Sequence, residues 1–359
     1  MTNDTSPNVT ETTKEPEVIL MENLTRAVQL YVPPVIIVLG VVGNILAYMV
    51  MRQPQYDRSS SSYFMKVLAI LDTIILVVRY LQRYIYMVNP TLVWEKNQIA
   101  TIFCKEFLFI TFFFMNLTHW VLAVMAVDRL IGIMFPLKAL VWCSVKRSRA
   151  YIIGLAIVFG VVHFPVWWKE YDDRRGTTLR TLCQISGIFA WYNDVNEDIY
   201  YFGGYFAPVL VLLVANIGIV ISVKKSGRRR NTMTTNMQGY NQKQNDKERH
   251  ILIMLMLVTW AFIFFLLPLV WDYFFWEVWK PLKLEGKVVA IRLSLYECLR
   301  VWQMFNHAAN FYLYCLGCER FRRHLHRTLF GHCCQGQSSE VKTLKYVRSI
   351  SGSLGKDVS

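Results

Sequence analysis

Polar side chains lie inside stretches of this sequence that are otherwise apolar, and they are the residues whose types could do chemistry. The run from Val301 to Cys318, for example, has no charged residue but includes two asparagines. An amide or a charged group is costly in an apolar helix unless another polar group meets it. We therefore expect polar partners for these side chains inside the protein, the chief cases being Asn44, Asp72, Asp128, Arg129, Asn306, Asn310 and Tyr314.

The elements that must position these residues are helices that cross a membrane. The charged fraction is 18% and the apolar fraction 54%, and a bilayer-crossing helix needs about 20 predominantly apolar residues. Two suitable runs, 67–88 and 288–318, are interrupted by charged residues. Five others carry no charge: Ala27–Met51, Phe107–Val127, Ala150–Trp168, Ile199–Val223 and Ile251–Trp271. The predicted fold class is an all-α membrane protein, a seven-transmembrane helix bundle.

The distribution of Lys and Arg predicts the orientation, because short cytosolic loops carry an excess of them. The segment between the fifth and sixth runs and the start of the tail after Cys318 are basic, whereas residues 1–27 carry mainly acids. We expect a plasma-membrane protein with its N-terminus extracellular and its C-terminus cytosolic. The net charge of +14 then needs no nucleic-acid partner. Three sequons in the outer segment are predicted glycosylation sites: Asn3, Asn8 and Asn23.

The ordered series of motifs resembles the rhodopsin-like, or class A, G-protein-coupled receptors. Cys104 stands 25 residues before Arg129, as the outer cysteine of that family stands before the arginine of its D-R-Y motif. Pro208 and Pro268 occupy the family's proline positions in helices five and six. Tyr314 is followed seven residues later by F-R. The resemblance covers about residues 28 to 334.

The resemblance implies a polar cluster at mid-membrane that binds a sodium ion in the resting state. The matching residues are Asn44, Asp72, Thr118, Asn306 and Asn310, with Asp72 as the metal-binding carboxylate. A purely structural hydrogen-bond network is the alternative. No other cofactor is expected.

The resemblance also implies a switch at the cytosolic end of helix three. Arg129 is expected to be held at rest by Asp128 and by a carboxylate on helix six, matched here by Glu248, and then freed to meet a heterotrimeric G protein. Tyr314 belongs to the same switch. The alternative is an ion-pair clamp without a signalling role. In the outer region the resemblance implies a disulfide, between Cys104 and Cys183.

Four residues depart from the family pattern. Leu130 replaces the tyrosine of D-R-Y, and Phe311 replaces the proline of N-P-x-x-Y. Leu266 stands where helix six usually has tryptophan, and Asn216 where helix five usually has tyrosine. Proline kinks a helix, so Phe311 predicts a straighter helix seven.

The ligand chemistry can be narrowed. Thr111 stands where amine receptors carry an aspartate, and no lysine occurs in 288–318 for a retinal Schiff base. Neither an amine receptor nor a photoreceptor is expected. The long second outer loop, 169–198, suits a β-hairpin lid of the kind found in peptide receptors. Aromatic residues including Tyr273 and Tyr296 ring the predicted mouth.

Basic side chains are expected to line the outer cavity. Arg79 and Arg83 follow Asp72 by seven and eleven residues, so α-helical periodicity places all three on one face. Arg300 joins them from helix seven. Such a cluster could hold a ligand carboxylate in bidentate fashion. The alternatives are snorkelling to the surface and internal pairing with Glu106 or Glu297.

The segment after helix seven predicts an amphipathic eighth helix on the inner leaflet, because apolar residues recur every four positions at Phe321, Leu325 and Leu329. Cys333 and Cys334 after it are candidate palmitoylation sites. The chain is thereby divided into an outer segment, the bundle, the eighth helix and a disordered cytosolic tail: 1–27, 28–317, 318–334 and 335–359.

The predicted protein is a receptor for an extracellular peptide, similar to the FMRFamide-type neuropeptide receptors of invertebrates. It would activate a heterotrimeric G protein, with arrestin, receptor kinases and membrane lipids as further partners. One alternative is a receptor of the same fold for a lipid or small organic acid, and a more distant one is an ion channel or transporter. The sequence offers no metal constellation, partnered nucleophile or phosphate-cradling loop, so no enzyme is predicted.

Overall fold

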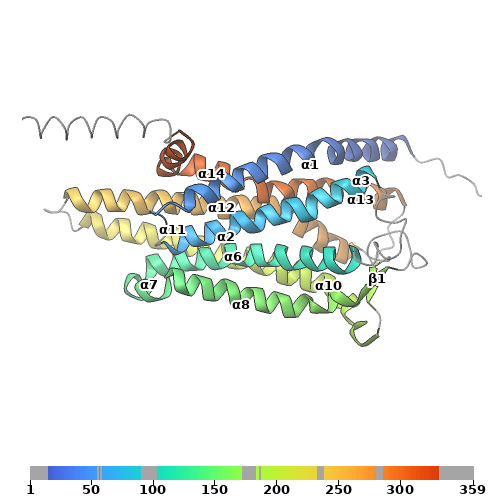
Figure 1. The fold of residues 1–359 in the computed structure, drawn as a ribbon, viewed down its shortest axis with the longest axis horizontal. Coiled ribbons are helices and arrows are strands. Elements are labelled where there is room, and N and C mark those ends of the chain that lie inside the picture. The colour runs from blue at the N-terminus through green and yellow to red at the C-terminus, as the bar shows by residue number, and fades with distance from the viewer. Residues whose placement is uncertain are drawn as a thin grey trace, which may run out of the picture.

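Long helices run side by side along one direction and make up nearly the whole protein (Figure 1). The computed structural model describes residues 15–54, 56, 59–89, 103–171, 183–185, 187–232, 238–279 and 286–330. Within these ranges the chain passes along the bundle seven times, as predicted. The passes comprise, in order, α1 (Pro16–Met51); α2 (Ser60–Ile74), η1 (Ile75–Leu81) and α3 (Gln82–Val88); η2 (Phe103–Phe107) and α6 (Leu108–Met134); α8 (Val145–His163) and η3 (Phe164–Trp168); η6 (Ile199–Phe206) and α11 (Ala207–Thr232); α12 (Gln238–Trp279); and α13 (Gly286–Ala308) and α14 (Asn310–Gly317).

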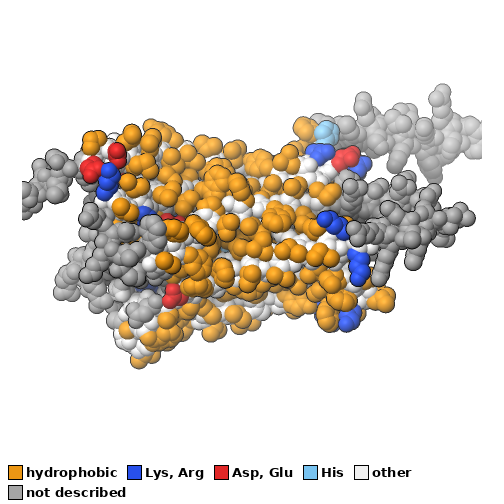
Figure 2. Space-filling model, turned by 180° about the vertical axis from the view of Figure 1, so that it is seen from behind, with side chains coloured by type: hydrophobic (Ala, Val, Ile, Leu, Met, Phe, Trp, Pro, Cys, Tyr) orange, Lys and Arg blue, Asp and Glu red, His pale blue; other side chains and the backbone are white. Residues whose placement is uncertain are grey.

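The face of the bundle seen in Figure 2 is a broad hydrophobic belt with charged side chains gathered at its two ends. Among the described residues, five helices are long and apolar enough to cross a membrane by length and composition. The second and seventh passes complete the bundle and carry charged residues in the halves nearer the start of α1, the end of the bundle that we call outer. This distribution is that of a protein whose middle lies in lipid.

The first helix begins earlier than the apolar run that predicts it. α1 starts at Pro16, with Pro in its first turn and Glu17 beside it, and both favour a helix N-terminus. The Lys287 ammonium of α13 lies 2.9 Å from Glu17 and also contacts Glu15. Its hydrogen bond and charge lower the pKa of the Glu17 carboxyl. The outer end of α1 is therefore tied to the seventh pass.

Close packing continues between α1 and the seventh pass at mid-membrane. A Cβ added to Gly40 would lie 2.8 Å from the Ala308 Cβ and 2.6 Å from Leu76. Small residues at such contacts let helix backbones approach in a membrane, where van der Waals packing replaces the hydrophobic driving force.

The seventh pass is interrupted at one residue, although Phe311 stands in place of the proline that would kink it. It is divided at Ala309, between α13 and α14. The side-chain amide of Asn44 on α1 donates a hydrogen bond of 3.0 Å to the His307 carbonyl, next to the division. A side chain that inserts into the backbone ladder can bend a helix without proline. We attribute the division to this contact.

Three stretches of π-helix occur in the outer halves of the second, third and fifth passes, namely η1, η2 and η6. Their hydrogen bonds span one more residue than those of an α-helix, and such stretches are frequent at functional sites. Side chains beyond each stretch are turned relative to those of a regular helix.

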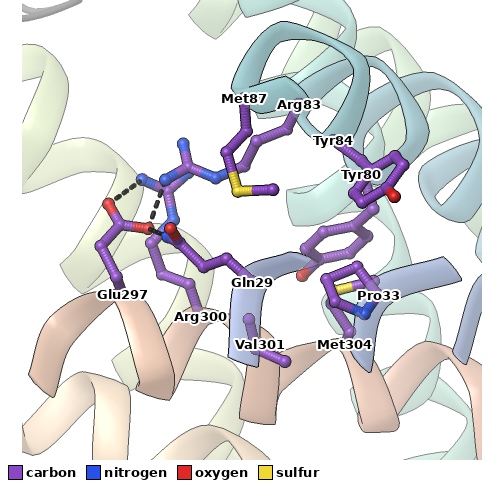
Figure 3. A pocket seen from close by; sticks show the side chains of 10 residues that line it. All are labelled: Gln29, Pro33, Tyr80, Arg83, Tyr84, Met87, Glu297, Arg300, Val301 and Met304. Atoms are coloured by element: carbon purple, nitrogen blue, oxygen red, sulfur yellow. Dashed lines mark hydrogen bonds and ion pairs between the residues drawn. The ribbon is translucent and has the colours of Figure 1, made fainter. Parts of the chain in front are cut away.

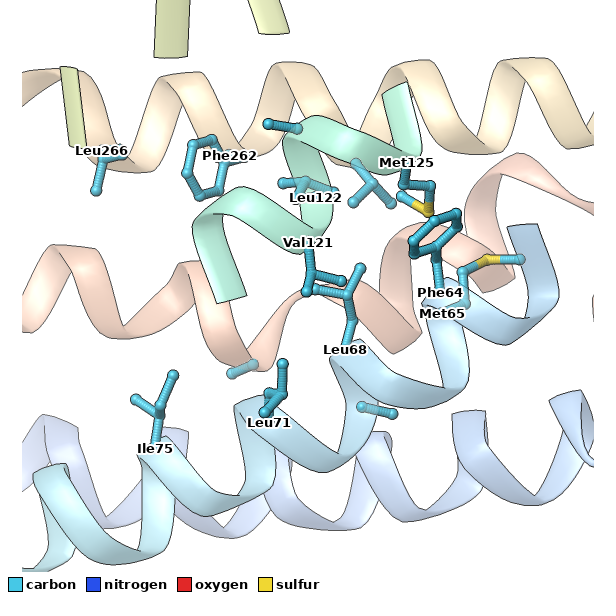
Figure 4. Packing of buried hydrophobic residues seen from close by; sticks show 14 of the residues in the cluster. Phe64, Met65, Leu68, Leu71, Ile75, Val121, Leu122, Met125, Phe262 and Leu266 are labelled. Carbon is cyan, nitrogen blue, oxygen red and sulfur yellow. The ribbon is translucent and has the colours of Figure 1, made fainter. Parts of the chain in front are cut away.

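The core lies where the second, third and sixth passes meet (Figure 4). Fully or almost fully buried side chains from α2, α6 and α12 interdigitate there: Phe64, Met65, Leu68, Val121, Leu122, Met125, Phe262 and Leu266. Leu266 thus fills the core at the position where the family usually has tryptophan. Asn216, which also departs from the family pattern, has a clear hydrogen-bond partner. The Thr259 hydroxyl of α12 donates to Asn216 Oδ1 of α11 at 3.0 Å.

A two-stranded hairpin covers the outer end. β1 (Lys169–Tyr171) pairs antiparallel with β2 (Cys183–Ile185), and the segment between them lies outside the described residues. A disulfide joins Cys183 to Cys104 in η2, with 5.5 Å between their Cα atoms, which confirms the predicted pairing. The hairpin leads through η5 (Gly187–Phe189) and α10 (Tyr192–Asp198) into the fifth pass.

Two short helices lie at the opposite end. α7 (Pro136–Trp142) follows the third pass. A helix over 319–330 follows α14 and is seen almost end-on in Figure 1, so it runs across the direction of the bundle. Its Phe321 is fully buried against Tyr314, with 5.6 Å between ring centroids. Leu329 is exposed. The predicted eighth helix is therefore present and held to the bundle by its first turn.

Candidate functional site

A cavity of about 310 Å³ opens between the outer halves of the first, second and seventh passes (Figure 3). Arg83 of α3 forms an ion pair with Glu297 of α13, and Gln29 of α1 donates to the same carboxylate at 2.8 Å. Arg300 Nη1 lies 3.7 Å from the other carboxylate oxygen. Two guanidinium groups therefore share one carboxylate. The lining is completed by Pro33, Tyr80, Tyr84, Met87, Val301 and Met304.

Arg79, the third predicted arginine, does not line this cavity. It is buried and donates a hydrogen bond of 2.8 Å to the Tyr200 hydroxyl. Tyr200 in turn bonds to Tyr205, which accepts a bond of 2.9 Å from Gln303. α-Helical periodicity had placed Arg79 and Arg83 on one face with Asp72, but η1 intervenes and turns the outer part of the helix.

Aromatic side chains connect the cavity to the fifth and sixth passes. The Arg300 guanidinium lies 5.5 Å from the centre of the Tyr296 ring. The Tyr296 hydroxyl is 3.0 Å from that of Tyr201, and the Tyr201 ring stacks on Tyr273 with 3.8 Å between centroids. Tyr273 donates to Asp198 at 2.8 Å. Both tyrosines predicted at the mouth thus belong to one chain of contacts that begins at Arg300.

The interior below this chain contains polar residues that the sequence interpretation missed. Asn116 lies 2.7 Å from His163, and His119 Nδ1 lies 2.7 Å from the Gly204 carbonyl oxygen. A Cβ on Gly204 would lie 1.8 Å from Asn116 Oδ1, so any other residue there would displace the Asn116 side chain. Thr111, the predicted ligand contact on the third pass, is buried and its hydroxyl has no hydrogen-bond partner among the described residues.

The mid-membrane cluster forms around Asp72. Asn310 Nδ2 donates to one carboxylate oxygen at 2.7 Å, and His307 Nδ1 lies 2.7 Å from the other. Asn44 bonds to the His307 backbone. Thr118 and Asn306 are buried as well, but Thr118 makes no hydrogen bond within the described part of the chain.

We propose that His307 takes the place of a sodium ion in this cluster. Each Asp72 oxygen has a polar neighbour at 2.7 Å, one of them His307 Nδ1. His307 was the missed member of the cluster. Its position between two predicted members, within a run that has no charge, was the signal that could have identified it.

At the end of the third pass that lies opposite the hairpin, Asp128 and Arg129 are joined as predicted. Arg129 Nε lies 3.1 Å from Asp128 Oδ2, and the Ser60 hydroxyl donates to that same oxygen at 2.9 Å. Arg129 also contacts Ser60. We call these three residues the inner latch. The Glu248 side chain lies outside the described residues, and Tyr314 is buried against Phe321.

Several predicted modification sites fall outside the described residues, namely Asn3, Asn8, Cys333 and Cys334. Asn23 is described and exposed on α1. Thr25, the hydroxyl residue of its sequon, is buried and its hydroxyl lies 3.5 Å from the Ser294 carbonyl. Glycosylation of Asn23 stays a prediction.

Comparison with known proteins places these sites in a family. The profile of the family described as 7 transmembrane receptor (rhodopsin family) matches residues 43–314. The chain is 23% identical over 337 residues to the FMRFamide receptor of Drosophila melanogaster, a match that covers 89% of this chain and 57% of that receptor. It is 24% identical over 269 residues to the probable G-protein coupled receptor B0563.6 of Caenorhabditis elegans, covering 70% of this chain and 57% of the relative.

The FMRFamide peptide receptor frpr-18 of Caenorhabditis elegans is 20% identical over 216 residues, which cover 56% of this chain and 47% of that receptor. The chain therefore spans about half the length of these relatives. The family match extends from the first pass to Tyr314 and includes the disulfide, the Asp72 cluster and the inner latch. The chain belongs to the rhodopsin family of seven-transmembrane receptors.

Proposed function

We propose that this receptor binds an extracellular peptide that brings a carboxylate to Arg83 and Arg300. The proposal rests on the excess of positive charge in the cavity, where two guanidinium groups share the carboxylate of Glu297. A second carboxylate from a ligand would balance the site with charge-assisted hydrogen bonds. The ring of Tyr296 beside Arg300 offers an apolar surface for the same group.

The size of the cavity suits part of a peptide. At about 30 Å³ for each non-hydrogen atom, the share of a water molecule in the liquid, a volume of 310 Å³ holds about ten atoms. One or two ligand side chains would fill it, while the remainder of the peptide would meet the hairpin of β1 and β2. The names of two relatives, both FMRFamide receptors, support a peptide ligand.

A small organic acid is the second candidate, because a cavity for about ten atoms with two arginines could hold such a molecule entirely. A lipid acid belongs to the same candidate class. The family match favours a receptor over an ion channel or transporter.

Ligand binding would be transmitted to a heterotrimeric G protein at the opposite end. An agonist can shift the receptor toward its active state only as far as it binds that state more tightly. We infer that this state frees Arg129 from the inner latch. α7 beside it presents an apolar face for a partner, since Leu137, Leu140 and Val141 are exposed, Leu137 by 83%.

The proposed location is the plasma membrane, with the hairpin end outside and the α7 end in the cytosol. Its support is the excess of Lys and Arg in the sequence between the fifth and sixth passes and after Cys318. Receptor kinases and arrestin would act on the serine-containing tail, which lies outside the described residues.

The test measures binding and signalling in the same cells. Cells that express the full chain would be exposed to peptides with and without acidic residues, to FMRFamide-type peptides, and to small organic and fatty acids, with calcium and cyclic AMP as readouts. We expect a response to an acidic peptide. Arg129→Ala should abolish that response while labelled peptide still binds at the cell surface.

Two controls make the result decisive. Surface expression of both forms is measured by antibody, and a receptor for another peptide in the same cells reports whether the signalling machinery is intact. A response only to organic acids would favour the second candidate. Loss of peptide binding together with signalling in Arg129→Ala would contradict the proposed separation of ligand site and inner latch.

A further inference from the structure

A second cavity, of about 540 Å³, lies between α12 and α13 and shares no lining residue with the first. Its walls are mainly apolar and several of them face outward from the bundle. Trp271 of α12 is 65% exposed and Leu295 of α13 is 48% exposed. In a membrane this cavity would open toward lipid. It is lined by Leu267, Pro268, Trp271, Asp272, Phe275, Trp276, Val288, Arg292, Leu295 and Leu299.

The cavity contains a polar group that the protein does not fully satisfy. Arg292 forms an ion pair of 2.9 Å with Asp272, and its guanidinium lies 4.1 Å from the centre of the Trp276 ring. Its Nε–H is buried and has no hydrogen-bond acceptor among the described residues. The Arg292 side chain as a whole lines the cavity and is 23% exposed, so its terminal N–H groups are open to an acceptor supplied by a ligand.

We propose that this cavity binds a single-chain lipid with an uncharged, hydrogen-bonding head, such as a monoacylglycerol, taken from the surrounding membrane. The apolar walls would hold the acyl chain, and the head would lie beside Arg292 and Asp272. At about 30 Å³ for each non-hydrogen atom, 540 Å³ accommodates about 18 atoms. That is the size of a monoacylglycerol with a chain of about twelve carbons, whereas a two-chain phospholipid is much larger.

The Arg292–Asp272 ion pair determines which lipid head group can bind. A carboxylate head would approach Asp272 as well as Arg292, and an ammonium head would meet the opposite conflict, because like charges at short range repel. A hydroxyl or amide head can donate to the Asp272 carboxylate and accept from the terminal N–H groups of Arg292 without adding charge. The site therefore favours a neutral head that both donates and accepts. It is independent of the peptide proposal, since it involves neither Arg83 nor Arg300.

The experiment uses the purified full chain in phosphatidylcholine nanodiscs and a photoactivatable, alkyne-tagged monoacylglycerol. After irradiation, labelled peptides are identified by mass spectrometry. We expect labelling to concentrate on the facing surfaces of α12 and α13. An excess of untagged monoacylglycerol should compete, whereas a fatty acid at a pH where it is ionised, or a long-chain amine, should compete at least about tenfold less well, the factor that corresponds to about 1.4 kcal/mol.

Two leucines of α13 provide a matched pair of variants. Leu295→Trp fills the cavity, while Leu293→Trp changes a residue of similar exposure, 51%, that does not line it. Displacing about two methylene groups of an acyl chain should weaken labelling by about tenfold in the first variant. The second should label as the wild type does.

Arg292→Lys tests the head without relying on the leucines. It keeps the positive charge beside Asp272 but removes the planar guanidinium and its several N–H groups, and loss of one hydrogen bond should reduce labelling by about fivefold. Unchanged labelling in both Leu295→Trp and Arg292→Lys would overturn the proposal. Equal loss in Leu293→Trp and Leu295→Trp would overturn it too, because it would indicate lipid of the surrounding belt only. Equal competition by the ionised fatty acid would overturn the assignment of the head.

Discussion

The outer cavity and the inner latch are both built around arginine, but they differ in how the charge is balanced. In the cavity, Arg83 and Arg300 share the carboxylate of Glu297. In the latch, Arg129 is paired one to one with the carboxylate of the neighbouring residue, Asp128. The Ser60 hydroxyl bonds to both of these residues. Among the described residues, Glu297 is the one carboxylate that lines the cavity, and under the proposed function a ligand supplies a second. Under the same proposal the latch must be broken before Arg129 can meet another protein.

The largest expected effect is at the cavity. Arg300→Gln removes one of the two guanidinium groups and should weaken binding of an acidic peptide by about 10- to 100-fold, since a hydrogen bond to a charged group contributes about 1.5 to 3 kcal/mol. The measurement is displacement of labelled peptide from membranes. Lys287→Gln, on the same helix but outside the cavity, is the matched control. Equal loss in both variants would contradict the comparison.

The second prediction extends the comparison to the mid-membrane cluster. If His307 holds the place of a cation beside Asp72, peptide binding to the wild type should not change when choline replaces sodium at equal ionic strength. His307→Ser should open that place. Sodium would then stabilise the resting state and weaken agonist binding by about tenfold, within the usual range of coupling between two sites.

Adding Asp72→Asn to His307→Ser removes the carboxylate and should remove the sodium effect. Sodium sensitivity of the wild type itself would show that His307 does not exclude the ion. The readout in each case is the affinity of the labelled peptide.

The third prediction tests whether the latch is complete. Ser60→Ala removes a hydroxyl that bonds to both Asp128 and Arg129. A typical hydrogen bond contributes about 1 kcal/mol, so the basal rate of nucleotide exchange on an added G protein should rise by about fivefold. Ser61→Ala is a close control, because the Ser61 hydroxyl is buried without a partner among the described residues. No rise in the Ser60 variant would mean that the latch does not restrain the receptor.

The smallest effect is expected at the outermost charges. The pKa of Glu17 is lowered and that of Lys287 raised, chiefly by the hydrogen bonds between them and from Lys287 to Glu15. The stabilising contribution of Glu17 is present above its ordinary pKa of 4.5 and is lost as pH falls through the lowered value. That of Lys287 is lost only as pH rises through its raised value. The bridge should therefore be independent of pH between these limits.

Lys287→Met should speed amide hydrogen exchange in the first turn of α1 by less than about fivefold, because exposed ion pairs contribute little. A larger change, or one that reaches the cavity, would show that the outer charges are coupled to the ligand site. Hydrogen exchange followed by mass spectrometry distinguishes the two regions.

The bundle could be predicted because five passes are long uncharged runs and the other two are apolar runs with a few charges, and its motifs could be placed by their order along the chain. The division at Ala309 could not, because Asn44, which contacts the adjoining turn, comes from the first pass. Local sequence had suggested the opposite, since Phe311 replaces a proline. Tertiary contact outweighed local preference at this position.

The candidate site was predicted in part. Arg83 and Arg300 were identified as cavity residues, and pairing with Glu297 was one of the alternatives considered. Gln29 was missed, although it is a polar residue near the outer end of an uncharged run. Arg79 was assigned to the same face as Arg83 because α-helical periodicity was assumed across η1, and a short π-helical stretch leaves no clear mark in the residue types.

The π-helical stretch η1 has one more residue than an α-helix of the same length. A relative whose second helix is α-helical throughout would therefore align with this chain only across a one-residue gap. An ungapped alignment would match Arg83 to a residue on another face. A deletion or insertion of a single codon within 75–81 would rotate the outer side chains relative to Glu297, while Asp72 and the inner half kept their register. Ligand preference in such receptors could therefore diverge in one genetic step without change to the inner latch.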